Sequence, residues 1–405
     1  MLGVALEGGG AKGAFHIGAM KALLEEGYEI DGIVGTSIGA FNAAMIAQGD
    51  FDKCLNMWRN ISPEQLFDIE DRYMANIINR NLDIKTISYL SGEAKKIILN
   101  RGIETDNLRK IVDDLIDEEK LRKSYMDFGL VTVKLGPLGP VELFKKDIPQ
   151  GKLKDYIMAS ARYPGLKMEP LDGKAYLDGG IYDNCPVNLL AKKNYDKIIA
   201  IRLNTNKMLK HIDDDVNVVE IQPSMDLGGT FIFTKELAHR NIKLGYYDAI
   251  KAIRKLRGRE YYIEPVDDNL IFSRLLEIPD DVIIEVGNSM GIENMLPKRM
   301  LFEYIIPNIA KYLNVNRGET YQDIIIALLE NMAKERNIEK FRIYSLQEFL
   351  QLIKDNEKEI NMQKKIEVSL RGLKRIAIEN ITQINMKILN EKLIDLLDES
   401  KLKKL

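Results

Sequence analysis

Two glycine-rich stretches near the amino terminus decide the fold of this chain: Glu7-Gly8-Gly9-Gly10-Ala11-Lys12-Gly13 and Gly35-Thr36-Ser37-Ile38-Gly39. Each follows a strand-like apolar run and precedes a run of small and apolar residues typical of a packed helix. Glycine lets a strand and a helix approach closely through a tight turn. The second stretch therefore predicts a nucleophile elbow, in which Ser37 sits on a strained turn with its hydroxyl exposed. The first predicts an oxyanion-binding turn.

The composition is that of an ordinary globular protein. The chain has 405 residues, of which 45% are hydrophobic, enough for one large domain and a smaller one. Its 58 basic and 61 acidic residues give a formal charge of −3, so no global field favours nucleic acid as a partner. The two cysteines, Cys54 and Cys185, show neither metal-ligand spacing nor a disulfide framework, which fits a reducing compartment.

The amino terminus enters a predicted strand at Leu2 without the basic and apolar stretches of a secretory signal. No apolar run reaches the roughly 18 residues that a membrane-spanning helix needs. We therefore expect a cytoplasmic protein, and any contact with membranes to be peripheral.

Strand-like and helical runs alternate up to about residue 256, which predicts an α/β fold with a mostly parallel sheet and helices on both faces. The clearest predicted strands are 2–7, 30–35, 129–133 and 197–203, and the clearest predicted helices are 14–26, 39–48, 105–118 and 186–193.

Two further regions are predicted to be helical. Residues 50–125 form a charged helical insertion, interpreted as a cap beside the site, whose apolar markers are Met57, Trp58, Phe67 and Tyr73. We place the first domain at 1–257 and a mainly helical region of unknown role at 258–405. Apolar residues spaced by three and four within 366–388 predict helices that pack on their neighbours; self-association into a homo-oligomer and membrane docking remain alternatives.

A serine at an elbow needs a base. In the usual order of a serine hydrolase on this kind of sheet the acid and then the histidine follow the serine, whereas His16 precedes it. His211 lies in a charged, loop-like stretch and His239 in a predicted amphipathic helix, which are poor contexts for a base. Asp178 ends a short strand before Gly179-Gly180, and a partly desolvated carboxylate within hydrogen-bond reach can activate a hydroxyl directly. Taken alone, the same residues also fit a plain turn.

Three blocks, residues 8–13, 35–39 and 178–180, together with Asn184 and Pro186, resemble the patatin-like phospholipases. The segments 13–18 and 159–164 add to the resemblance, which covers residues 1 to about 256. It implies a three-layer α/β/α fold, a Ser/Asp dyad, no metal or other cofactor, and hydrolysis of fatty-acyl esters of phospholipids, with peripheral membrane contact.

Carried over by residue, the resemblance makes Ser37 the nucleophile and Asp178 the general base. The oxyanion turn comprises Gly8, Gly9, Gly10, Lys12 and Gly13, with the first three offering backbone N–H groups at a helix N-terminus. Lys12 either reinforces that turn electrostatically or pairs with Glu7. Supporting glycines that shape the turns are Gly35, Gly39, Gly179 and Gly180.

Other interpretations compete with this one. The spacing Gly8-x-Gly10-x-x-Gly13, with Asp31 further on, also fits a dinucleotide-binding turn. A second Gly-x-Ser-x-Gly at 287–291 contains Ser289 and is interpreted as a decoy, because the residues after it are not small. A non-catalytic lipid-binding or signalling scaffold and a plain soluble carboxylesterase are the remaining alternatives.

Overall fold

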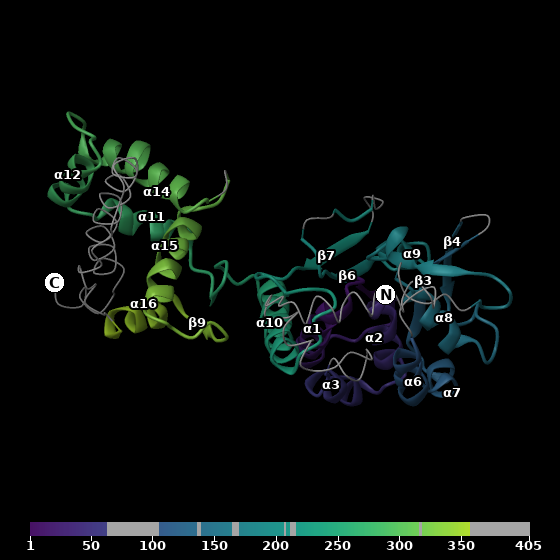
Figure 1. Cartoon of the computed structure of the whole chain (residues 1–405). Coiled ribbons are helices and arrows are strands. Elements are labelled where there is room, and N and C mark those ends of the chain that lie inside the picture. Colours follow the sequence, from purple (N-terminus) through teal and green to yellow (C-terminus); the bar gives the residue numbers. More distant parts are fainter. Residues whose placement is uncertain are drawn as a thin grey trace, which may run out of the picture. The chain divides into compact units, whose positions relative to one another are not determined.

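The computed structural model describes residues 1–62, 105–135, 139–163, 170–205, 208–210, 216–315 and 318–356. The chain divides into two compact units, Met1–Ile253 and Arg254–Leu405 (Figure 1). This division falls shortly before the predicted domain boundary at residue 257. We describe each unit by itself.

A mixed, mostly parallel seven-stranded sheet forms the centre of the first unit, as predicted (Figure 1). The order is β4-β3-β2-β1-β6-β7, and β5 pairs with β3. β3 is antiparallel to β4 and β5, and the remaining pairs are parallel. The strands are β1 (Leu2–Leu6), β2 (Gly32–Thr36), β3 (Asp127–Lys134), β4 (Gly139–Phe144), β5 (Tyr176–Asp178), β6 (Lys197–Ile201) and β7 (Asn217–Ile221).

Helices cover both faces of this sheet. A Cβ on Gly32 would meet the Tyr195 ring, just after α9, whereas a Cβ on Gly35 would meet the backbone of α2. Side chains alternate between faces along a strand, so α9 and α2 lie on opposite sides of β2. The helices of this unit are α1 (Ala14–Glu25), α2 (Ile38–Ala47), α3 (Phe51–Arg59), α6 (Asp106–Leu115), α7 (Glu118–Lys123), α8 (Leu153–Ser160), α9 (Val187–Ala191) and α10 (Lys235–Arg254).

The register of β3 brings two distant parts of the sequence together. β4 occupies one edge of β3 along Gly129–Lys134, and β2 and β5 share the other edge. Thr36, the last residue of β2, pairs with Val131, and Asp178, the last residue of β5, pairs with the next residue, Thr132. Because β2 and β5 run in opposite directions along β3, Ser37 and Asp178 leave their strands at the same point.

The second unit is mainly helical, as predicted, although β8 (Tyr262–Ile263) and β9 (Ile343–Tyr344) form a short parallel pair that the sequence did not suggest. Its helices enclose one apolar core that includes Ile271, Val286, Ile326 and Phe349. They are α11 (Asp268–Leu276), α12 (Asp280–Ser289), α13 (Pro297–Arg299), a π-helical segment Met300–Ile305, α14 (Ile306–Tyr312), α15 (Tyr321–Glu335) and α16 (Leu346–Asp355).

The second Gly-x-Ser-x-Gly lies on α12 rather than on a strand-turn-helix elbow. Ser289 is the last residue of this helix, and its Oγ donates to the carbonyl of Val286 at 2.6 Å. The apolar run 282–286 therefore belongs to a helix. No helix in the described ranges is both long and apolar enough to cross a bilayer. The predicted helices of 366–388 lie outside the described residues.

Candidate active site

Ser37 occupies a strained turn between β2 and α2. Its backbone has φ 57° and ψ −126°, a conformation that costs a non-glycine residue roughly 1–3 kcal/mol. The Ser37 N–H donates to Ser160 Oγ at 3.0 Å, and the Ser37 carbonyl accepts the N–H groups of Ala40 and Phe41. Hydrogen bonds on both sides of the residue therefore hold the strained turn.

The two glycines that flank this turn are required by close backbone packing. A Cβ on Gly35 would lie 2.2 Å from the carbonyl carbon of Gly39, and a Cβ on Gly39 would lie 2.3 Å from the carbonyl oxygen of Leu6. Gly179 is equally tight, since its Cβ would lie 2.2 Å from the Val131 carbonyl oxygen. These contacts fix where the turns lie relative to the sheet.

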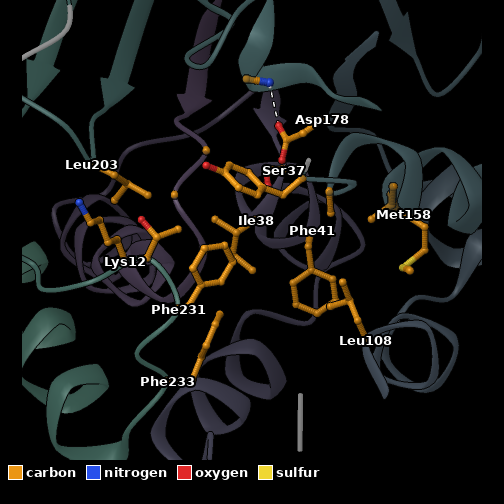
Figure 2. A pocket seen from close by; sticks show the side chains of 18 of the residues that line it. Lys12, Ser37, Ile38, Phe41, Leu108, Met158, Asp178, Leu203, Phe231 and Phe233 are labelled. Atoms are coloured by element: carbon orange, nitrogen blue, oxygen red, sulfur yellow. Dashed lines mark hydrogen bonds between the residues drawn. The ribbon is translucent and has the colours of Figure 1, made fainter. Parts of the chain in front are cut away.

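Asp178 lies beside Ser37 at the carboxyl end of β2 (Figure 2). Its side chain is 5% exposed, lies beside the Ser37 side chain, and accepts the Gly180 N–H at 2.7 Å. Its own N–H donates to the Arg162 carbonyl at 2.8 Å. Burial raises the pKa of the Asp178 carboxyl above its usual value, and the Gly180 N–H and the neighbouring Ser37 hydroxyl oppose that rise.

The glycine turn lies against Ser37 but does not leave every amide free. The Gly8 N–H donates to the Asn184 carbonyl at 2.9 Å, and Asn184 Nδ2 donates back to the Gly8 carbonyl at 3.0 Å. Gly8 is therefore not available as the oxyanion donor that the sequence suggested. In the described part of the chain, the amides of Gly9 and Gly10 have no protein acceptor. Gly10 has φ 57°, which glycine adopts without strain.

Gly13 lies behind the turn. It is buried and does not line the pocket, and its carbonyl accepts Asn42 Nδ2 at 3.0 Å. A Cβ on Gly13 would lie 2.8 Å from Ile38 and 2.9 Å from the Trp58 ring. Gly13 therefore supports close packing of the turn.

Lys12 lines the pocket and forms no ion pair with any described residue. Glu7 instead contacts the residues that follow β6. Its Oε2 accepts the N–H groups of Leu203 and Asn204 and lies 3.3 Å from Arg202 Nε. The alternative that Lys12 pairs with Glu7 is wrong.

The described histidines lie away from Ser37. His16 is fully buried, its Nδ1 lies 3.3 Å from Asn42 Nδ2, and burial lowers its pKa to about 3. His239 lies on α10, with its Nε2 2.9 Å from the Arg59 carbonyl oxygen. Neither lines the pocket. His211 lies outside the described residues.

Asp31 lies at the amino end of β2, where its carboxylate accepts the Leu2 N–H at 2.7 Å. A dinucleotide-binding acid follows its strand at the carboxyl end of the sheet, beside the glycine turn. The geometry therefore contradicts the dinucleotide interpretation.

Ser37 and Asp178 open onto an apolar pocket of about 550 Å³ (Figure 2). The predicted insertion contributes Met57 and Trp58, whereas Phe67 and Tyr73 lie outside the described residues. Sequence reasoning did not single out most of the wall, because its residues come from segments far apart in the chain. Ile38 lies in the elbow motif, and Ile61, Leu108, Ile111 and Val112 lie in the predicted insertion, but no pattern marks them as lining residues. The missed apolar lining residues are Ile38, Phe41, Ile61, Leu108, Ile111, Val112, Ile157, Met158, Ala161, Tyr163, Ile181, Leu203, Phe231 and Phe233.

Comparison with known proteins identifies most of the first unit. Residues 4–191 match the model of the patatin-like phospholipase family. These residues form a patatin-like phospholipase domain. Ser37, Asp178 and the glycine turn all lie inside it.

Curated relatives of the patatin-like domain include enzymes and uncharacterised proteins. The chain is 27% identical over 318 residues to Lysophospholipase NTE1 of Pyricularia oryzae, and 29% identical over 216 residues to an uncharacterised NTE family protein of Mycobacterium tuberculosis. The matches span 72% of this chain but 18% of the fungal protein, and 53% of this chain and 52% of the mycobacterial one. Among solved structures, VipD from Legionella pneumophila gives a TM-score of 0.40 at 14% identity, over 98% of this chain and 90% of that chain.

Proposed function

We propose that this protein is a serine lipid acyl hydrolase that cleaves fatty-acyl esters of phospholipids, of phospholipase A or lysophospholipase type. The observation that carries the proposal is the placement of Ser37 beside the buried carboxyl of Asp178, with both residues lining an apolar pocket. The patatin-like domain and its similarity to Lysophospholipase NTE1 support the same reaction class.

In the first half of the reaction, Asp178 accepts the Ser37 hydroxyl proton as Oγ attacks the ester carbonyl. The negative charge then moves to the carbonyl oxygen, which accepts the N–H groups of Gly9 and Gly10. The Ile38 amide, at the N-terminus of α2, is a third candidate donor, as expected for the residue after the nucleophile. Lys12 adds positive charge near this oxygen.

When the tetrahedral intermediate collapses, the bond to the alcohol breaks and the leaving oxygen takes the proton from Asp178. The acyl chain remains on Ser37 Oγ and lies in the apolar pocket. Asp178 then removes a proton from water, which attacks the acyl carbonyl, and the proton passes back to Ser37 as the fatty acid leaves. These proposed steps require no metal or other cofactor.

Peripheral membrane contact is part of the proposal. Three large apolar side chains at the pocket mouth remain about half exposed: Tyr163 at 50%, Ile181 at 54% and Phe231 at 48%. The Tyr163 and Phe231 rings pack edge to face at 5.5 Å. We define these three residues as the rim. An apolar rim around the entrance suits a substrate that is drawn from a lipid surface, because aromatic side chains are stable at such interfaces.

The test is hydrolysis of a fluorogenic phospholipid by the purified chain, with a chelator present. We expect release of fatty acid by the parent, none above background by Ser37→Ala, and parental activity for the matched control Ser289→Ala. Activity that persists in Ser37→Ala and disappears in Ser289→Ala would overturn the assignment of the nucleophile.

The alternatives predict other results in the same assay. A non-catalytic scaffold would show no release and no labelling of Ser37 by a fluorophosphonate probe. A soluble carboxylesterase would hydrolyse a monomeric short-chain ester as fast as aggregated phospholipid.

A further inference from the structure

The end of α8 contacts both members of the proposed catalytic pair. Ser160, its last residue, accepts the Ser37 N–H on its Oγ at 3.0 Å and donates its own proton to the Val131 carbonyl at 2.7 Å. Two residues further on, the Arg162 carbonyl accepts the Asp178 N–H at 2.8 Å. One turn of chain thus fixes the backbone of Ser37 and of Asp178.

The Ser160 hydroxyl has a defined orientation. A serine hydroxyl has one proton, and Ser160 donates it in a hydrogen bond to the Val131 carbonyl. The lone pairs of its oxygen are therefore left to accept the Ser37 N–H. Val131 pairs with Thr36 in the sheet, and the next residue of β3 pairs with Asp178. Ser160 therefore ties the serine turn to the strand that also places the base.

The Ser37 backbone needs this restraint. Its φ of 57° and ψ of −126° are unfavourable for a side-chain-bearing residue and persist only where the surroundings impose them. Ser160 is fully buried, so its loss would leave the Ser37 N–H without an acceptor away from water. If the turn relaxes so that the Ser37 N–H reaches another acceptor, Ser37 Oγ rotates away from Asp178.

We infer that Ser160 is a positioning residue, which acts through Ser37 by holding the nucleophile turn in register with Asp178. This inference rests on the proposed function. A purely structural role, as a hydroxyl that ends α8 and fills space against β3, would change stability without changing the reactivity of Ser37.

The experiment compares the 405-residue parent with Ser160→Ala, Ser160→Thr and a control, Ser345→Ala. The control removes another serine hydroxyl that accepts a backbone N–H, that of Glu348, in the second unit. For each protein we would measure the rate of Ser37 labelling by a fluorophosphonate, kcat and KM on a fluorogenic phospholipid, and the midpoint of thermal unfolding.

We expect Ser160→Ala to lower the labelling rate and kcat by roughly 10- to 100-fold, the effect of a small misplacement of a reacting group, with KM unchanged. Ser160→Thr, which keeps the hydroxyl, should restore most of both rates, and Ser345→Ala should match the parent. If Ser160→Ala does not fold, Ser160→Cys substitutes a weaker acceptor of similar shape and should react at an intermediate rate.

Labelling of Ser160→Ala or, in its place, Ser160→Cys at the parental rate would overturn the inference. So would equal slowing of the Ser345→Ala control, or a change confined to KM. If the parent itself is neither labelled nor active, the proposed function fails, and that result is distinct from failure of the Ser160 assignment.

Discussion

At the scale of single residues, two neighbouring aspartates show how environment separates their roles. The Asp178 carboxyl lies beside the Ser37 side chain. Asp183 is also buried, but it is its backbone carbonyl that faces the serine turn, accepting Thr36 Oγ1 at 2.8 Å. Burial raises the pKa of both carboxyls, that of Asp183 to about 6. Only Asp178 is placed to receive the Ser37 proton.

Replacing the base should separate activity from stability. Asp178→Asn keeps the shape of the side chain but cannot accept the proton, so we expect kcat to fall by roughly 10²–10⁴-fold. Because burial raises its pKa, the ionised form of Asp178 is less favourable in the folded state than in the unfolded chain, and removing the charge should leave the unfolding midpoint unchanged or higher. Fluorogenic turnover and thermal unfolding, measured on the same samples, check both parts. Full activity in Asp178→Asn together with loss of activity in His239→Ala would instead indicate a triad.

The raised pKa of Asp178 also predicts how kcat/KM depends on pH. Asp178 must be ionised to act as a base, so kcat/KM should fall as pH drops through its raised folded-state pKa, above the range of an ordinary aspartate. Asp183 could produce a similar acid limb near pH 6. A pH profile of Asp183→Asn distinguishes the two, because we expect the limb to remain. Disappearance of the limb in Asp183→Asn would assign it to Asp183.

At the scale of elements, the site depends on how closely α2 approaches β1. Gly39 lies against the Leu6 carbonyl, a backbone atom that cannot move without shifting the strand. Gly3, on β1, instead faces side-chain atoms, Leu190 Cδ1 at 2.7 Å and Tyr195 Cδ1 at 2.9 Å, which can shift without displacing a backbone segment. These two glycines of similar tightness therefore make a matched comparison.

We expect Gly39→Ala to destabilise the fold by about 3 kcal/mol, the upper end of the cost of overpacking, and to reduce Ser37 labelling because the elbow is displaced. Gly3→Ala should cost about 1 kcal/mol and leave labelling near the parental rate. Chemical denaturation gives the free energies of unfolding. Similar losses for both variants would contradict the backbone argument.

At the scale of the whole molecule, we expect substrate delivery to depend on the rim of Tyr163, Ile181 and Phe231. Tyr125 is also exposed, at 84%, but precedes β3 at the amino end of the sheet, opposite the carboxyl ends where Ser37 lies. It serves as a control for the general effect of losing an exposed aromatic residue.

We expect Phe231→Ser to weaken sedimentation with phospholipid vesicles, measured in the Ser37→Ala background so that the lipid remains intact, because it removes apolar area from the rim. Tyr125→Ser should bind as well as its parent. We also expect the parent to hydrolyse vesicular phospholipid faster than a monomeric short-chain ester. Equal vesicle binding by Phe231→Ser and its parent would contradict the role of the rim.

Much of the fold was predictable because its signals are local. The strands before Gly8 and Ser37, the short strand that ends at Asp178 and the helices after the glycine turns were all predicted from runs of a few residues. The edge strands β4 and β7 were not, since half-exposed strands carry a weak pattern. The apolar run 282–286, before the second Gly-x-Ser-x-Gly, has no period that separates a strand from a helix, and the structure places it on α12.

The sequence by itself determined the three blocks, their order and the chemistry their residues can perform, because turn geometry and glycine requirements act over a few neighbouring positions. Only the tertiary structure decided which groups meet. The register of β2 and β5 on β3 places Asp178 beside Ser37, and Ser160 holds the serine turn. The Asn184 carbonyl accepts the Gly8 N–H, and Glu7 pairs with Arg202 rather than with Lys12. Each of these contacts joins residues far apart in the chain, and their pairing follows from sheet register and packing, which no local pattern encodes.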